Sequence, residues 1–209
     1  MYLMISRPDI SFAVNYFSRF QDKGTEVMWK QLTRILRYLK GTKNYELIYK
    51  RDGNQGLEAY ADADWGQDVV DRKSVTGYCI FWNNNLVQWC TKKQLCVALS
   101  SAEAELVSLC TCVCDGLWVK KLLLDLEMKD ITFKVYEDNQ ACISLVQEPG
   151  KIKRVKHIDI KLKFMYQLIK EKKIFVEYIR SENQLADGLT KGLNRIKFKN
   201  FVFNMFEQF

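Results

Sequence analysis

A short apolar run, Leu57 to Ala61, constrains this chain most, because it ends on two acids, Asp62 and Asp64. A strand that stops on an acid places a fixed negative charge at the edge of a sheet, next to a loop. Three further carboxylates stand at similar junctions downstream: Glu105 early in a predicted helix, Asp138 at the end of a predicted strand, and Asp187 in a late predicted helix. We therefore expect four of these acids to meet.

The order of predicted elements sets the fold class. Alternating or continuous apolar runs predict strands, helical spacing predicts helices, and Asn83-Asn84-Asn85 predicts a hairpin turn. The predicted strands are 57–62, 76–82, 86–91, 132–137 and 174–180, and the predicted helices are 100–126, 139–147, 151–173 and 181–193. Three hairpin-joined strands followed by two that each come after a helix imply an α/β fold. Its mixed five-stranded sheet has three antiparallel strands, then two parallel strands, flanked by helices.

A smaller segment precedes that sheet. Helices are predicted over 9–20 and 26–40, with a strand from Tyr45 to Lys50, and a turn cluster over 51–56 marks a boundary. We therefore divide the chain into a mainly helical segment (1–54), a sheet domain (55–193) and a tail (194–209) of no assigned role. About fifty residues make a small independent core, so the first segment is expected to pack on the sheet domain.

Charge and composition narrow the partners. The net charge of +7 favours a polyanion, either nucleic acid or an acidic membrane surface. The apolar runs are far shorter than the roughly 20 residues of a membrane span, and the first residues lack a signal-peptide pattern. We therefore expect an intracellular protein, cytoplasmic or nuclear, and not secreted. The seven cysteines predict no disulfide framework, and Cys110, Cys112 and Cys114 are poorly spaced for zinc on a helix.

Each acid also has a simple structural interpretation. Asp62 and Asp64 are typical turn residues, and Asp138 is a possible helix cap. Glu105 differs, because it lies on or near the buried side of its helix, where an unpaired carboxylate is costly. Several carboxylates at one end of a sheet would repel one another unless cations lay between them. Oxygen ligands suit Mg²⁺ or Mn²⁺, and two such ions can hydrolyse a phosphodiester.

Six motifs together resemble the ribonuclease H domain of copia-type LTR retrotransposon Pol polyproteins. They are Tyr60-Ala-Asp-Ala-Asp-Trp-Gly66, Asp71-Arg-Lys-Ser-Val-Thr-Gly-Tyr78, Val97-Ala-Leu-Ser-Ser-Ala-Glu-Ala-Glu105, Tyr136-Glu-Asp-Asn-Gln140, Lys156-His-Ile-Asp159 and Glu182-Asn-Gln-Leu-Ala-Asp-Gly-Leu-Thr-Lys191. The resemblance spans about residues 57 to 192. Residues 1–50 resemble the last part of the reverse transcriptase of the same polyproteins.

The resemblance implies the ribonuclease H fold and hydrolysis of the RNA strand of an RNA–DNA hybrid. It implies that Asp62, Glu105, Asp138 and Asp187 are the catalytic residues and hold two Mg²⁺ ions, with Mn²⁺ as a substitute. Asp62 occupies the position of the first acid in the motif, which gives Asp64 a supporting role. Gly192 departs from the family pattern, in which a proline is usual after Leu-Thr-Lys.

Nucleic-acid contacts are expected on two surfaces. The segment from Lys151 to Lys173 carries nine Lys or Arg residues, which either form a solvated helix face or contact phosphates. The residues singled out in it are Lys153, Arg154, Lys156 and His157, and His157 is read as a phosphate contact or structural residue rather than a metal ligand. The remaining candidates are Trp65, Arg72, Lys73, Ser100, Ser101 and Gln140.

Three functions are compatible with this pattern. The first is a metal-dependent nuclease acting on hybrids, with the rest of a reverse transcriptase polyprotein as a possible partner. The second is an inactive nucleic-acid-binding remnant of the same fold. The third is a different nuclease or an integrase of that fold. The sequence leaves the oligomeric state open.

Overall fold

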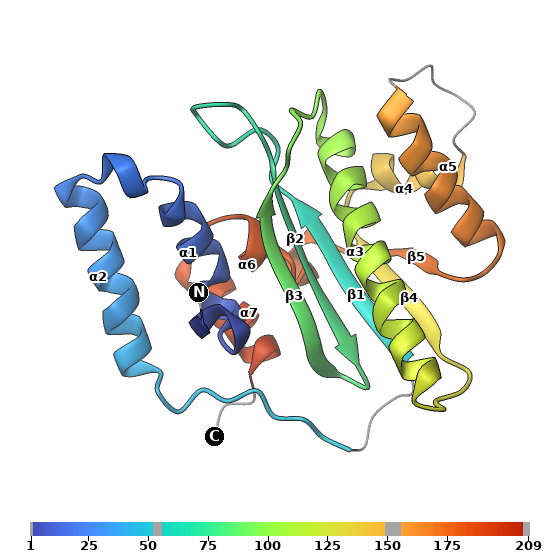
Figure 1. Cartoon of the computed structure of the whole chain (residues 1–209), viewed down its shortest axis with the longest axis horizontal. Coiled ribbons are helices and arrows are strands. Elements are labelled where there is room, and N and C mark those ends of the chain that lie inside the picture. Colours follow the sequence, from blue (N-terminus) through green and yellow to red (C-terminus); the bar gives the residue numbers. More distant parts are fainter. Residues whose placement is uncertain (1, 52–55, 149–155, 207–209) are drawn as a thin grey trace.

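A computed structural model describes residues 2–51, 56–148 and 156–206 and centres on one five-stranded sheet (Figure 1). Its strands are β1 (Gly56–Ala63), β2 (Val75–Trp82), β3 (Asn85–Lys93), β4 (Thr132–Glu137) and β5 (Phe175–Tyr178). They lie in the order β3-β2-β1-β4-β5. The pairs β1–β2 and β2–β3 are antiparallel, whereas β1–β4 and β4–β5 are parallel. The predicted mixed sheet is thus confirmed.

The hairpin between β2 and β3 follows from its asparagines. Asn83 and Asn84 adopt φ angles of 50° and 62°, the left-handed conformation that this residue type tolerates best among non-glycine residues. The tight turn sets the register of the two strands, in which Tyr78 pairs with Cys90.

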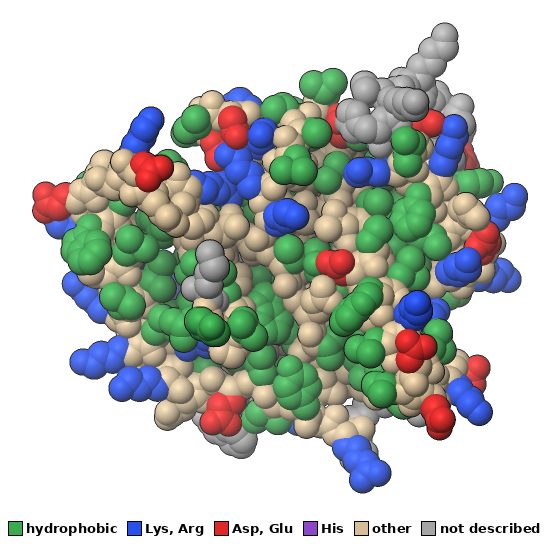
Figure 2. Space-filling view, viewed as in Figure 1, with side chains coloured by type: hydrophobic (Ala, Val, Ile, Leu, Met, Phe, Trp, Pro, Cys, Tyr) green, Lys and Arg blue, Asp and Glu red, His purple; other side chains and the backbone are tan. Residues whose placement is uncertain are grey.

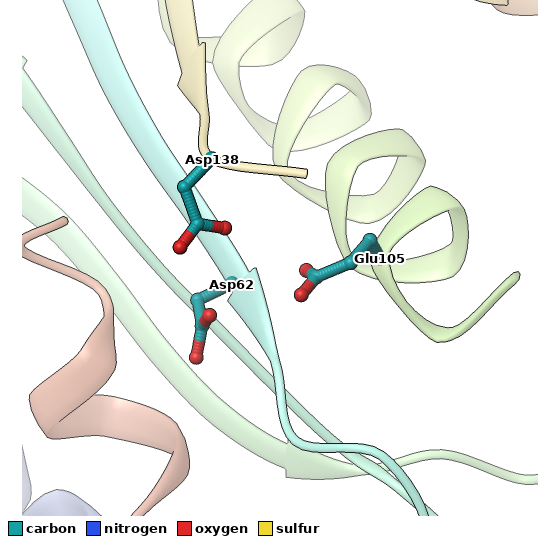
Figure 3. A group of neighbouring side chains, drawn as sticks. All are labelled: Asp62, Glu105 and Asp138. Atoms are coloured by element: carbon teal, nitrogen blue, oxygen red, sulfur yellow. The ribbon is translucent and has the colours of Figure 1, made fainter. Parts of the chain in front are cut away.

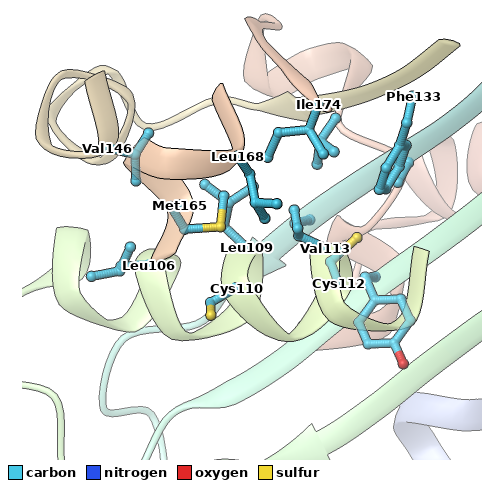
Figure 4. Close-up of a cluster of buried hydrophobic side chains, with 14 of the residues drawn as sticks. Leu106, Leu109, Cys110, Cys112, Val113, Phe133, Val146, Met165, Leu168 and Ile174 are labelled. Atoms are coloured by element: carbon cyan, nitrogen blue, oxygen red, sulfur yellow. The ribbon is translucent and has the colours of Figure 1, made fainter. Parts of the chain in front are cut away.

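Three helices cover one face of the sheet: α3 (Ser101–Asp125), α4 (Gln140–Gln147) and α5 (Lys156–Lys170). Figure 4 shows their apolar side chains meeting over the sheet, among them Leu106, Leu109, Val113, Met165 and Leu168. Helix α3 runs without interruption through Gly116, as the predicted helix over 100–126 requires. A Cβ there would lie 2.1 Å from the ring of Phe133, so glycine lets the helix pass directly over β4.

The opposite face is covered by segments from both ends of the chain. Helices α1 (Ser11–Ser18), α6 (Asp187–Thr190) and α7 (Arg195–Met205) lie on this side in Figure 1. Tail residues form a second core with side chains of the sheet and of α6. Phe201, Val202, Met205 and Phe206 pack with Cys79, Phe81 and Leu86 of the sheet and with Leu189 of α6. The tail, which had no assigned role, therefore completes the second layer of the fold.

A buried ion pair joins the N-terminal segment to the tail. Arg7 forms a 2.7 Å salt bridge with Asp9, and its guanidinium also donates to the hydroxyl and carbonyl oxygens of Thr42. The same group lies over the rings of Tyr38 and Phe206. Tyr38 belongs to α2 (Glu26–Gly41), a helix that stands apart in Figure 1 and buries none of its side chains. Three short 3-10 helices, Tyr2–Ile5, Pro8–Ile10 and Gln21–Lys23, complete this segment.

Two predicted elements differ in the structure. Tyr45 to Lys50 forms a single β-bridge residue at Glu46 and no strand of the sheet, and the backbone of Lys50 pairs with the side-chain amide of Asn85. The predicted helix over 181–193 is only a 3-10 turn (Ser181–Asn183) and the single turn of α6. Gln184, between them, is extended, and its side chain donates to the carbonyl oxygen of Ala61 on β1.

The predicted helix over 151–173 is seen as α5, and its first five residues lie outside the described parts of the chain. Within those parts, none of the helices is long and apolar enough to cross a lipid bilayer.

Candidate active site

Three carboxylates converge at one edge of the sheet (Figure 3). Asp62 lies near the end of β1, Asp138 follows β4, and Glu105 lies in the second turn of α3. One oxygen from each falls within 4.8 Å of the other two. The parallel pairing of β1 with β4 places the two aspartates side by side, and α3 crosses above them. The convergence predicted for these three acids is therefore present.

Asp62 is held in place by its neighbours. Its carboxylate is buried and accepts a hydrogen bond from the Thr190 hydroxyl of α6. The Ser108 hydroxyl of α3 donates to the Asp62 carbonyl oxygen at 2.7 Å, which ties helix to strand. Burial raises the pKa of Asp62 to about 6, against an opposing effect from the Lys191 ammonium group.

Glu105 brings an incompletely satisfied carboxylate to the same place. Its Oε2 atom is buried and has no hydrogen-bond partner among the described residues, while the Ala63 backbone amide bonds to the same side chain. Burial, together with the charges of Glu137 and Asp62, raises the pKa of Glu105 far above its ordinary value. An all-oxygen donor set with an orphaned buried oxygen fits a hard divalent cation such as Mg²⁺ or Mn²⁺. Asp62, Glu105 and Asp138 are the residues that would hold it.

Asp187 lies beside this trio but faces lysines. Its Oδ1 is 2.7 Å from Lys191 Nζ, and its Oδ2 is 3.9 Å from Lys197 Nζ. Lys191 Nζ also lies 3.7 Å from Asp62 Oδ2, so one ammonium group links the two aspartates. The pKa of Lys191 is raised, because the effect of the two carboxylates outweighs that of partial burial. The fourth predicted acid is thus adjacent to the site, with a cation already against it.

Asp64 has a structural role. Its carboxylate accepts a hydrogen bond from the Val75 amide, and its own amide donates to the Val75 carbonyl oxygen at 3.2 Å. These bonds close the β1–β2 ladder beyond Ala63. They account for Asp64 as a supporting residue, whereas Asp62 belongs to the trio.

Glu137 was not singled out from the sequence. It is fully buried beneath α3, and its Oε2 has no hydrogen-bond partner among the described residues. Burial raises its pKa well above the ordinary value. Phe133, Val135 and Glu137 alternate along β4 toward the core, so the period-two pattern of that strand would have revealed a carboxyl group on the apolar face.

The polar and aromatic residues predicted to contact nucleic acid differ in exposure and in hydrogen bonding. Gln140 is exposed in the first turn of α4, next to Asp138, and Ser101 is exposed in the first turn of α3. The Ser100 hydroxyl caps α3 by accepting from the Glu103 amide. Trp65 is 55% exposed, although its indole nitrogen donates to Ala98.

The basic candidates are exposed, half-buried or outside the described residues. Arg72 is exposed, and half-buried Lys73 lies 3.7 Å from Asp71. Lys153 and Arg154 lie outside the described residues, and Lys156 and His157 lie in α5 with side chains that are not described. Figure 2 shows lysine and arginine side chains along the α5 side of the molecule, where Lys163 and Lys170 are exposed.

Comparison with known proteins places the chain among transposon polyproteins. It is 38% identical over 202 residues to the retrovirus-related Pol polyprotein from transposon RE1 of Arabidopsis thaliana, and 34% identical over 200 residues to that from transposon TNT 1-94 of Nicotiana tabacum. These matches cover 96% and 95% of this chain but 14% and 15% of the polyproteins. The chain therefore spans about one seventh of the length of these relatives.

Two other comparisons add to this. The chain is 42% identical over 120 residues to the secreted RxLR effector protein 161 of Plasmopara viticola, covering 57% of this chain and 84% of that protein. A ribonuclease H1 isolated from compost by a metagenomic approach matches the structure with a TM-score of 0.51 and 16% identity, over 66% of this chain and 94% of that one. No family model matches the sequence. The transposon relatives confirm the resemblance drawn from the motifs, and the structural match confirms the ribonuclease H fold.

Proposed function

Because the chain belongs with the retrovirus-related Pol polyproteins of transposons, of which it matches one segment, we propose that it is a ribonuclease H-type nuclease. It hydrolyses the RNA strand of RNA–DNA hybrids, and it uses divalent metal ions. The observation that carries the proposal is the convergence of Asp62, Glu105 and Asp138 within 4.8 Å on a ribonuclease H fold.

Some residues of the site would bind metal, and others orient the metal-binding residues. Asp62, Glu105 and Asp138 bind cations through their carboxylate oxygens, and Asp187 is the additional carboxylate beside Asp62. Bound Mg²⁺ or Mn²⁺, as two ions, would activate the attacking water and stabilise the leaving oxygen of the phosphodiester. Thr190 and Ser108 orient Asp62, since one holds its carboxylate and the other its carbonyl oxygen.

Exposed residues around the trio contact the substrate. Gln140 and Ser101 lie close enough in the chain to Asp138 and Glu105 to contact the sugar edge of a bound hybrid beside the acids. Arg72, Lys73 and the lysines of α5 contact phosphates, which orients a duplex without reading its sequence. Recognition of the hybrid then depends on groove shape and on 2′-hydroxyl groups.

A cleavage assay on a labelled RNA–DNA hybrid tests this proposal. With Mg²⁺, the chain should cut the RNA strand, and EDTA should stop the reaction. Asp62→Asn should lower the rate by more than about a hundredfold, because even changes around the ligands of a metal site cost up to that factor. The matched control is Asp22→Asn, an exposed aspartate far along the chain from the acids, which should keep the parent rate.

The alternatives give different results in the same assay. An inactive remnant would bind the hybrid in a salt-sensitive way and leave it intact. A nuclease or integrase with another substrate would prefer double-stranded DNA. An Asp62→Asn variant as active as the parent would refute the assignment of the site.

A further inference from the structure

The cation nearest to the acids is a lysine of the chain itself. Lys191 Nζ lies 2.7 Å from Asp187 Oδ1 and 3.7 Å from Asp62 Oδ2. An ion bound between Asp62 and Asp187 would use oxygens of both carboxylates. It is a second ion, separate from the one held by Asp62, Glu105 and Asp138. The ammonium group and such an ion would therefore compete for the same oxygens.

The position of Lys191 in the fold allows its side chain either to contact the two aspartates or to move into solvent. Its backbone amide donates to the Asp187 carbonyl oxygen and ends α6, and the chain is extended there, so the side chain starts beside the acids. The side chain is 34% exposed, in contrast to 3% for Asp62 and 8% for Asp187. A lysine with an open side can move into solvent on its four-carbon stem, whereas the two aspartates are fixed by the core.

We propose that Lys191 is a built-in counter-ion that holds the place of a second metal ion between Asp62 and Asp187. It stabilises the metal-free site by separating two buried carboxylates. It also makes the two ions unequal, because the ion at the Asp62–Glu105–Asp138 trio binds without displacing a cation while the second must displace Lys191. This inference rests on the proposed metal dependence and adds an order and a difference in affinity to it.

Manganese titration of the chain without nucleic acid tests this directly, with free Mn²⁺ followed by electron paramagnetic resonance. In the parent chain, one ion should bind more tightly than the next. Lys191→Met should lower the second dissociation constant about tenfold or more, a change of about 1.4 kcal/mol, and should lower the first by a smaller factor, because Asp62 also holds the first ion. Lys199→Met is the matched control, since it removes the same charge from an exposed position on α7 and should change neither constant.

Several results would overturn the proposal. If the second ion binds Lys191→Met no more tightly than it binds the parent chain, the lysine does not compete for that site. Equal dissociation constants for the two ions in the parent chain would also contradict the proposal. If Lys191→Met fails to fold, Lys191→Gln removes the charge, keeps a donor and serves the same comparison.

The experiment also separates this proposal from the nuclease assignment. Because no substrate is present, two metal sites that respond as described in a chain that cuts no hybrid would support Lys191 as a counter-ion and refute the nuclease. Cleavage of the hybrid together with an unaltered second site in Lys191→Met would support the nuclease and refute the counter-ion.

Discussion

At the scale of single residues, the positive charge that the described chain places against the acids, on Lys191, reaches Asp62 and Asp187 but not Glu105. Burial raises the pKa values of Asp62 and Glu105, which means that their protonated forms are favoured in the folded chain. Lys191 offsets the charge of Asp62 and Asp187 but does not touch Glu105 at ion-pair distance in the described structure. The folded site thus prefers either protons or metal at Glu105.

This preference predicts an unusual dependence of stability on pH. A carboxyl group whose pKa is higher in the folded than in the unfolded chain makes the free energy of unfolding increase as pH falls through the interval between the two values. That interval runs from about 4 to about 6 for Asp62, and upward from the ordinary value for Glu105. In EDTA, the chain should therefore become more stable from pH 8 to pH 5, by about 1.4 kcal/mol per pH unit for each proton bound.

Denaturant unfolding at several pH values measures this effect. Glu105→Gln should reduce the slope, because it removes one of the groups that bind protons on folding. Added Mg²⁺ should reduce it too, since metal binds the ionised carboxylates. A free energy of unfolding that rises toward pH 8 without metal would contradict the assignment of these groups.

At the scale of elements, the single turn of α6 depends on the tail helix beneath it. Gly188 follows Asp187, and a Cβ added there would lie 2.6 Å from the ring of Phe201 on α7. The ring therefore presses directly on the turn that carries the fourth acid. This contact explains a glycine that is otherwise unfavourable in a helix.

Gly188→Ala should consequently destabilise the chain by about 1–3 kcal/mol, the usual range for overpacking a core. Gly192→Ala is the control, because a Cβ there meets nothing within 4 Å, and it should change stability by less than about 0.5 kcal/mol. Adding Phe201→Leu to Gly188→Ala should restore part of the loss in thermal unfolding. An unchanged melting temperature in Gly188→Ala would show that α6 does not depend on this contact.

The sequence predicted the elements with strong periodicity and missed those defined by distant contacts. All five strands of the sheet and the hairpin turn lie close to their predicted places, because alternation and asparagine turns are local properties. The predicted strand from Tyr45 to Lys50 failed, since its backbone partner is the Asn85 side chain, 35 residues away. The short length of α6 also depends on contacts with residues distant in the sequence: the hydrogen bond of Gln184 to β1 and the packing of the Phe201 ring.

The candidate site shows the same division. The motifs predicted the convergence of Asp62, Glu105 and Asp138, because the ends of strands and the starts of helices are readable in sequence. The place of Lys191 between Asp62 and Asp187 was not predicted, since it depends on the angle at which α6 meets β1. The burial of Glu137 follows from the alternation along β4, which places this residue on the same face as Phe133 and Val135.

At the scale of the whole molecule, the two ends of the chain and the sheet form one structure. Arg7 and Tyr38 both donate to Asp9 within the first segment. The Arg7 guanidinium lies over the ring of Phe206 in the tail, and the Tyr38 ring contacts that of Phe198. Removing one partner of a buried ion pair leaves the other charge unpaired, which costs about 3–5 kcal/mol. Arg7→Met should lower the free energy of unfolding by that amount.

The matched control is Arg37→Met, an exposed arginine of α2, for which we expect a change below about 0.5 kcal/mol. Hydrogen exchange of the β2 amides shows whether the loss reaches the sheet. If the N-terminal segment and the sheet unfold together, exchange in β2 should accelerate by the same free energy as global unfolding. Protection in β2 that is unaffected by Arg7→Met would instead mean that the two parts unfold independently.

The N-terminal segment also contacts an outer strand of the sheet. β3 is an outer strand of the sheet, and an uncovered outer strand offers unpaired backbone groups to other chains. Here the Asn15 side chain of α1 donates to the Thr91 carbonyl oxygen, and the Trp89 indole donates to the Met4 carbonyl oxygen. A version trimmed to the ribonuclease H motifs would keep every acid of the site and lose this cover. We expect it to be more prone to edge-to-edge aggregation, because Asn15 and Met4 would no longer contact β3.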